Sequence, residues 1–167
     1  MPSDARIQES IDLLVKATEH MAAQVSALPQ AVAAARPGDG WSPAQIAYHV
    51  GLTSEALFTP AFTGAAPFME PAPDGFVETF SFDTIPARVT TFPHLVPPDV
   101  IPAEGVRKLR EANAALAETM RSMPPERLSL CAKLGFGTLS IQQMAEFAAG
   151  HVLRHQAQLE RTLAGQA

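Results

Sequence analysis

Cysteine is nearly absent from the chain, because Cys131 is the only one among 167 residues. A lone cysteine excludes an internal disulfide framework and suits a reducing compartment such as the cytoplasm. A thiol could serve as a nucleophile, but no activating pattern surrounds Cys131. We therefore interpret it as a thiol of the core.

Long hydrophobic runs and excess positive charge are also lacking. No run of about 18 uncharged apolar residues occurs, so the sequence predicts no membrane span. The first residues lack the basic and apolar blocks of a signal peptide. The net charge of −5 gives no reason to expect nucleic acid or an anionic membrane as partner. With 47% hydrophobic residues, we expect one cytoplasmic domain over residues 1–167 with a substantial core.

Helical periodicity is what the sequence has in abundance. Apolar residues recur at spacings of three and four in four stretches, namely 3–28, 42 to about 60–64, 103–123 and 140–163. Two of these stretches open with a capping-box pattern, a serine followed three residues later by glutamine, at Ser42 and at Ser140. The inner face predicted for the third stretch includes Arg110. The pattern predicts an all-α four-helix bundle.

The connectors between these stretches differ greatly in length. The first and last are short enough for antiparallel neighbours, whereas residues 64–102 form a long, proline-rich connector. Such a crossover can travel the length of the bundle, which favours an up-down-down-up arrangement with the crossover between helices 2 and 3. Phe76, Phe80 and Phe82 lie an even number of residues apart, as side chains on one face of a strand do, which predicts a short extended piece over 75–83. Whether the connector is a lid or a plain crossover stays open.

Histidine is scarce, yet three of the five histidines fall on or beside predicted inner faces: His49, His151 and His155. His151 and His155 lie one helical turn apart. A buried imidazole needs a hydrogen-bond partner or a metal, so either backbone carbonyls or a metal ion would satisfy these rings. The expected topology brings His49 to about their level. We expect Trp41 and His94 near the mouth of this site, as candidate substrate-pocket residues.

The tryptophan-led start of helix 2, with Trp41-Ser-Pro and then His49, and the later His151-Val-Leu-Arg-His155 together resemble the DinB/YfiT superfamily. The resemblance covers nearly the whole chain. It implies an up-down-down-up bundle, often a homodimer, with a divalent metal held by His49, His151 and His155. Some relatives are transferases or isomerases that use a low-molecular-weight thiol such as bacillithiol or mycothiol.

The donor set supports the same assignment. Three neutral imidazoles suit zinc, nickel, iron or copper and leave positions open for a ligand. The His151–His155 spacing is that of a zinc-peptidase motif, but Val152 stands where the catalytic glutamate would be. We therefore expect a metal-dependent S-transferase acting with a small thiol on a small electrophile. The alternatives are a metal-dependent hydrolase and a non-catalytic, dimeric bundle that binds a metal or ligand. No catalytic residue is identified, because no carboxylate is placed as a general base.

Overall fold

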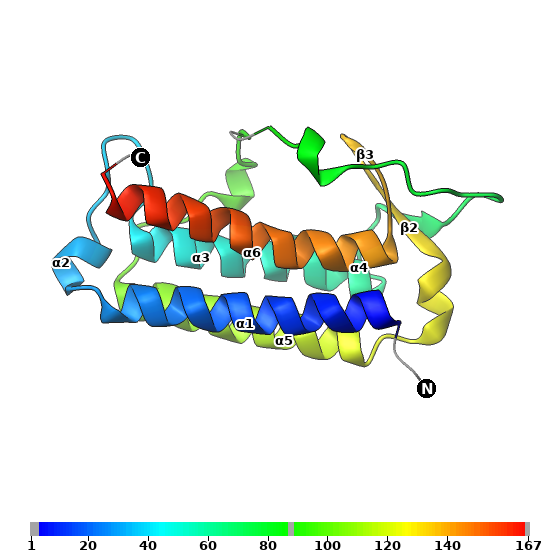
Figure 1. The fold of residues 1–167 in the computed structure, drawn as a ribbon, viewed down its shortest axis with the longest axis horizontal. Helices are drawn as coiled ribbons and strands as arrows, with labels where there is room; N and C mark the ends of the chain where they lie inside the picture. The colour runs from blue at the N-terminus through cyan, green and yellow to red at the C-terminus, as the bar shows by residue number, and fades with distance from the viewer. Residues whose placement is uncertain (1–3, 87–88, 166–167) are drawn as a thin grey trace.

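The structure is a computed structural model that describes residues 4–86 and 89–165. Within these residues, four long helical segments pack side by side (Figure 1). They are α1 (Ala5–Ala27); α3 (Pro43–Thr53), continued by a π-helical turn η1 (Ser54–Phe58) and by α4 (Thr59–Thr63); α5 (Pro102–Arg121); and α6 (Ile141–Leu163). The predicted all-α four-helix bundle is confirmed.

The predicted helix starts are confirmed at both capping boxes. At α3, the Ser42 hydroxyl accepts a hydrogen bond from the backbone N–H of Gln45, whose side chain accepts one from the N–H of Ser42. Ser140 and Gln143 make the same reciprocal pair at α6. These bonds satisfy backbone donors that a helix start leaves without partners. They fix where the two histidine-bearing helices begin.

Helices α3 and α5 run in the same direction and approach closely through two glycines. A Cβ atom placed on Gly105 would lie 2.4 Å from the carbonyl oxygen of Ala44. One placed on Gly51, further along α3, would lie 2.6 Å from the carbonyl oxygen of Lys108. Only glycine allows backbones this close. Both contacts advance in the same sense along the two helices, so the helices lie parallel, and the crossover that joins them runs back along the bundle (Figure 1).

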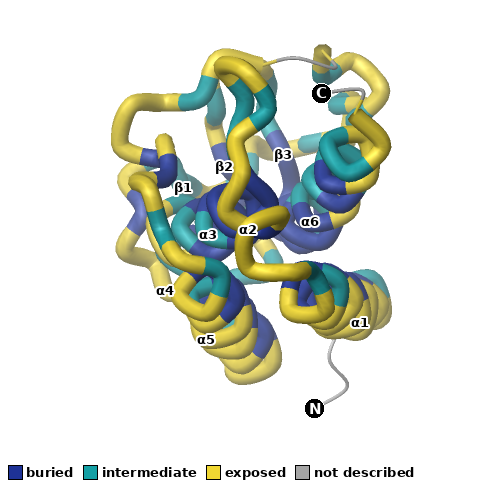
Figure 2. Tube along the Cα trace, turned by 90° about the vertical axis from the view of Figure 1, so that its left-hand side faces the viewer, coloured by how far each residue is buried: buried dark blue, intermediate teal, exposed yellow. Residues whose placement is uncertain are grey.

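The core lies between the helices, whose buried faces turn inward (Figure 2). Most of the predicted seam residues are buried, among them Ile11, Leu14, Met21, Leu109, Met144 and Leu159. Arg110 was predicted on the inner face and is instead exposed, where it pairs with Glu19 of α1. A guanidinium is rarely buried without a partner, and Ala112 and Ala117 join the other predicted residues on the inner face of α5.

A small antiparallel sheet lies at one end of the bundle, with strand order β1-β2-β3. Its strands are β1 (Met69–Pro71), β2 (Leu130–Leu134) and β3 (Gly137–Ser140). The extended piece expected over 75–83 is not a strand of this sheet: β1 comes earlier, and this region packs Phe80 and Phe82 on the core and ends in a 3-10 turn, η2 (Phe82–Thr84). Strand β1 forms where the chain meets β2, which is more than 50 residues away in sequence. Local periodicity cannot show such a partner.

The remaining elements are short. Helix α2 (Gln30–Ala33) lies in the first connector, η3 (Pro93–Leu95) in the crossover, and η4 (Pro125–Ser129) before the hairpin. The crossover is tied to the bundle by Glu78, whose carboxylate accepts hydrogen bonds from Arg6 at 2.8 Å and from the Ser140 hydroxyl at 2.5 Å. These bonds lower the pKa of Glu78, with the Arg6 bond as the largest cause. Among the described residues, no helix has the length and apolarity needed to cross a membrane.

Candidate metal centre

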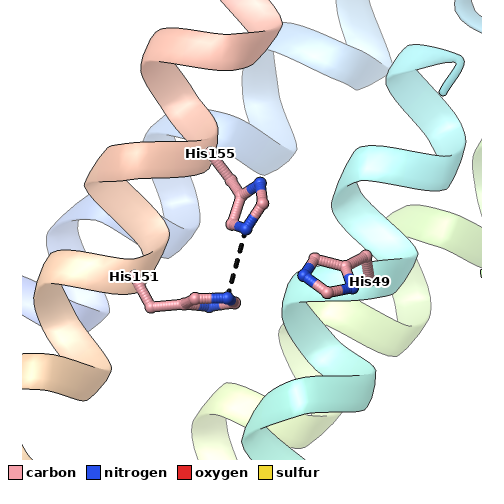
Figure 3. Close-up of side chains that lie close together, drawn as sticks. All are labelled: His49, His151 and His155. Carbon is pink, nitrogen blue, oxygen red and sulfur yellow. Dashed lines mark hydrogen bonds between the residues drawn. The ribbon is translucent and has the colours of Figure 1, made fainter. Parts of the chain in front are cut away.

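Three imidazoles converge between α3 and α6 (Figure 3). One ring nitrogen from each of His49, His151 and His155 lies within 4.8 Å of the others. The Nε2 atoms of His151 and His155 are 3.1 Å apart, and the ring centroid of His49 is 4.6 Å from that of His155. The structure thus brings together the three residues that the sequence predicts as ligands.

Burial keeps these rings neutral. His49 is 4% exposed, and desolvation lowers its pKa below 6.5. Desolvation also lowers the pKa of His155 to about 3, helped by the nearby His49. The pKa of His151 is lowered well below its ordinary value by desolvation and by the two neighbouring imidazoles. A neutral imidazole keeps one nitrogen lone pair, so each ring can donate to a metal near pH 7.

Two of the rings have a hydrogen-bond acceptor at Nδ1. The Nδ1–H of His49 donates to the carbonyl oxygen of Leu95 at 2.7 Å, and that of His155 donates to Oε1 of Gln158 at 2.7 Å. A carbonyl oxygen can only accept, so in both rings the proton is on Nδ1 and the lone pair is on Nε2. By contrast, Nδ1 of His151 is buried and has no hydrogen-bond partner among the described residues.

This donor set fits a divalent transition metal. Ring nitrogens from two helices converge, the rings are neutral, and two are oriented by outer acceptors as metal-binding histidines commonly are. Nδ1 of His151 has no partner among the described residues, and it is Nε2 of this ring that faces Nε2 of His155. Imidazole nitrogens suit zinc, nickel, iron or copper better than oxygen-seeking magnesium or calcium.

Aromatic side chains flank the three imidazoles on two sides. The Trp41 ring lies 4.6 Å from the His49 ring and 6.4 Å from the His155 ring, between centroids. Phe58 packs edge-on against His151, at 5.7 Å between centroids. The predicted pocket residue Trp41 therefore lies against the cluster. The exposed ring of His94 instead stacks on Phe92, at 5.9 Å between centroids. The residue after it, Leu95, supplies the carbonyl oxygen that accepts the hydrogen bond from His49.

Phe58 reaches this position through the π-helical turn η1. In a π turn the hydrogen bonds span five residues, so one more residue fits into the turn than in an α-helix. Phe58 is fully buried and contacts Phe147 of α6 at 5.2 Å as well as His151. Phe147 precedes His151 by one helical turn. The irregular turn therefore supports the wall beside the cluster.

Nearby carboxylates are engaged elsewhere. Glu55 pairs with Lys108, and Glu146 pairs with Arg6. Val152, at the position of the peptidase glutamate, is fully buried. Each of these two carboxylates is thus paired with a cation of another helix.

Sequence reasoning missed three parts of this site. The Leu95 acceptor is a backbone carbonyl, which leaves no signature in the residue type. Phe58 depends on a π turn that periodicity does not show. Gln158 could have been found, because it follows His155 by three residues and such pairs lie on one face of a helix.

Comparison with known proteins gives one family. The family model described as the DinB superfamily matches residues 13–159, a range that includes all three histidines. Comparison with curated proteins finds no match.

Proposed function

The chain belongs to the DinB superfamily, and we propose that it binds one divalent transition metal and uses it to transfer a small thiol to a small electrophile. The observation that carries this proposal is the convergence of three neutral imidazoles from two helices. His49, His151 and His155 would hold the metal. Zinc, nickel and iron all suit such a nitrogen donor set.

The bound metal would supply an open coordination position that lowers the pKa of a thiol or water placed there. A thiol becomes a strong nucleophile once it loses its proton. Hydrolysis of a peptide would in addition call for a carboxylate base, and Val152 stands at the position of that base. Thiol transfer therefore agrees better than peptide hydrolysis with the residues around the site.

The residues of the chain would orient and shield the reactants. Leu95 and Gln158 hold two imidazoles with their Nε2 lone pairs available. Trp41 packs beside His49 and His155, Phe58 packs beside His151, and both give the cluster an apolar wall. Such walls exclude water and favour an electrophile with an apolar body. In this reaction the thiol sulfur forms the new bond to carbon, and the thiol proton is released to solvent. A halide leaves with the electron pair of its broken bond, whereas an opened epoxide or an activated alkene keeps that pair and takes a proton from solvent.

The test begins with metal analysis of protein purified without a histidine tag. Conjugation of several low-molecular-weight thiols to an aryl halide, an epoxide and an activated alkene is then measured with and without added zinc, nickel or iron. We expect metal-dependent conjugation that a variant lacking all three histidines has lost. His20→Ala is the matched control, because His20 is exposed on α1.

Two results would contradict the proposal. One is conjugation by the triple variant at the wild-type rate, which would place the chemistry elsewhere. The other is metal-dependent hydrolysis of small esters or amides with no conjugation of any thiol, which would favour the hydrolase instead. Metal binding without either reaction would identify a non-catalytic metal-binding bundle.

A further inference from the structure

The three imidazoles are not held equally. His49 donates to a backbone carbonyl and His155 to a side-chain amide, each at 2.7 Å, while Nδ1 of His151 has no partner among the described residues. Gln158 is therefore a side chain outside the cluster whose polar atom sets the protonation pattern of a ring inside it. It lies on α6, three residues after His155, on the same face of the helix.

We propose that Gln158 is a positioning residue: its Oε1 atom fixes the orientation and the Nδ1–H tautomer of His155, so that the Nε2 lone pair points into the centre. This inference rests on the proposed function where it concerns metal affinity. The tautomer itself is a property of the protein without metal. Gln158 would not touch a substrate or a metal, and it acts only through His155.

In the structure the oxygen of the Gln158 amide faces Nδ1 of His155. If the Gln158 amide nitrogen faced Nδ1, it would donate to that atom, and the ring proton would sit on Nε2. Nε2 of His155 would then have no lone pair to offer toward His49 and His151. The oxygen-facing arrangement is the one in which His155 can be a ligand through Nε2.

The effect of Gln158 extends to a second ring. Nε2 of His155 lies 3.1 Å from Nε2 of His151, so a protonated His151 Nε2 can donate to the lone pair that Gln158 maintains. This bond orients His151, whose ring has no other polar partner among the residues that the structure describes. One amide oxygen thus organises both histidines of α6. His49 is held separately, by the carbonyl of Leu95.

The test compares two substitutions of similar size. Gln158→Leu removes the acceptor, whereas Gln158→Glu keeps an acceptor oxygen at the same reach. The matched control is Gln142→Leu on the same helix, because Gln142 donates to Asp4 at 3.0 Å at the opposite end of α6. Thermal unfolding of each metal-free variant establishes that it is folded.

Two measurements are then made. Nitrogen-15 NMR of the metal-free proteins reports which nitrogen of His155 carries the proton. We expect Nδ1–H in the wild type, in Gln158→Glu and in the control, and a mixture of tautomers in Gln158→Leu. Calorimetric titration with zinc should show Gln158→Leu binding about 10- to 100-fold more weakly, the usual effect of losing such an outer partner. Gln158→Glu should recover most of that loss.

The inference is overturned if Gln158→Leu keeps both the wild-type tautomer and the wild-type zinc affinity. It is also overturned if Gln158→Glu binds zinc as weakly as Gln158→Leu. Failure of the wild type to bind zinc, nickel or iron would overturn the proposed function instead. In that case the NMR comparison still decides whether Gln158 sets the tautomer of His155.

Discussion

Replacing His49 with alanine should abolish the stabilisation of the fold by zinc. Any ligand that binds only the folded state stabilises it by an amount set by its concentration relative to its dissociation constant. The large core does not depend on the metal, so the metal-free protein should fold with or without His49. The quantity to compare is therefore the zinc-induced shift in Tm within each variant, rather than Tm itself.

The size of the shift follows from the length of the chain. At a free zinc concentration of 100 times the dissociation constant, the stabilisation is about 2.7 kcal/mol. Unfolding entropy near 2.1 cal/mol/K per residue gives roughly 350 cal/mol/K for 167 residues. Dividing the first value by the second predicts an increase in Tm of about 8 °C for the wild type.

The assay is thermal unfolding followed by circular dichroism at a fixed free zinc concentration. We expect the full shift in the wild type and in His20→Ala, and little shift in His49→Ala, because one of three ligands is lost. His151→Ala and His155→Ala should behave like His49→Ala. A wild-type shift that persists in the triple variant would refute the reasoning, as would a wild type unmoved by zinc, nickel and iron alike.

Four further predictions concern pH, packing and assembly. In metal-free protein the pKa of His155 in the folded state is about 3, below the ordinary 6.5. Between these two values the unfolded chain binds more protons than the folded one. The free energy of unfolding should therefore fall as pH decreases below 6.5, by up to about 1.4 kcal/mol per pH unit per imidazole. Urea titrations at pH 7 and 5 measure this, and a His155→Gln variant with the same pH dependence would contradict it. Ser42→Ala should cost about 1 kcal/mol, because α3 loses its cap; unchanged stability in urea would argue against the cap. Gly105→Ala should destabilise the fold by roughly 1–3 kcal/mol, because the new Cβ would meet the Ala44 carbonyl. Gly150→Ala should instead stabilise it, because Gly150 is exposed on α6 and a Cβ there meets nothing within 4 Å. Equal effects of the two substitutions on stability would refute the close contact. Light scattering should give the mass of a homodimer, and a monomer mass at micromolar and higher concentrations would count against it.

Much of the fold was predictable because its determinants are local. Apolar spacing identifies each long helix, and the boxes at Ser42 and Ser140 fix two helix starts to the residue. The pairing of His151 with His155 follows from helical geometry alone. Placing His49 beside them needed the topology as well, which was inferred from the length of the crossover.

The rest depends on contacts between distant parts of the chain. Strand β1 exists only because β2 lies beside it, so no local pattern marks its place. The Leu95 carbonyl reaches His49 through the path of the crossover, and any residue type could supply that atom. Arg110 shows a different limit, because apolar spacing does not distinguish a core position from one at the edge of the helix interface.

The π turn at Ser54–Phe58 has a consequence for length variation among related chains. Because this turn holds one residue more than an α-turn, removing one residue from it would leave a regular α-turn, and the helix beyond it would keep roughly its direction relative to α3. His49 lies before the turn and Phe58 at its end, so both could keep their places beside His151. A single-codon deletion in the regular part of α3 would instead rotate all following residues by about 100°. The turn is therefore the place in this helix where the chain can lose a residue with the least disturbance of the cluster and its wall.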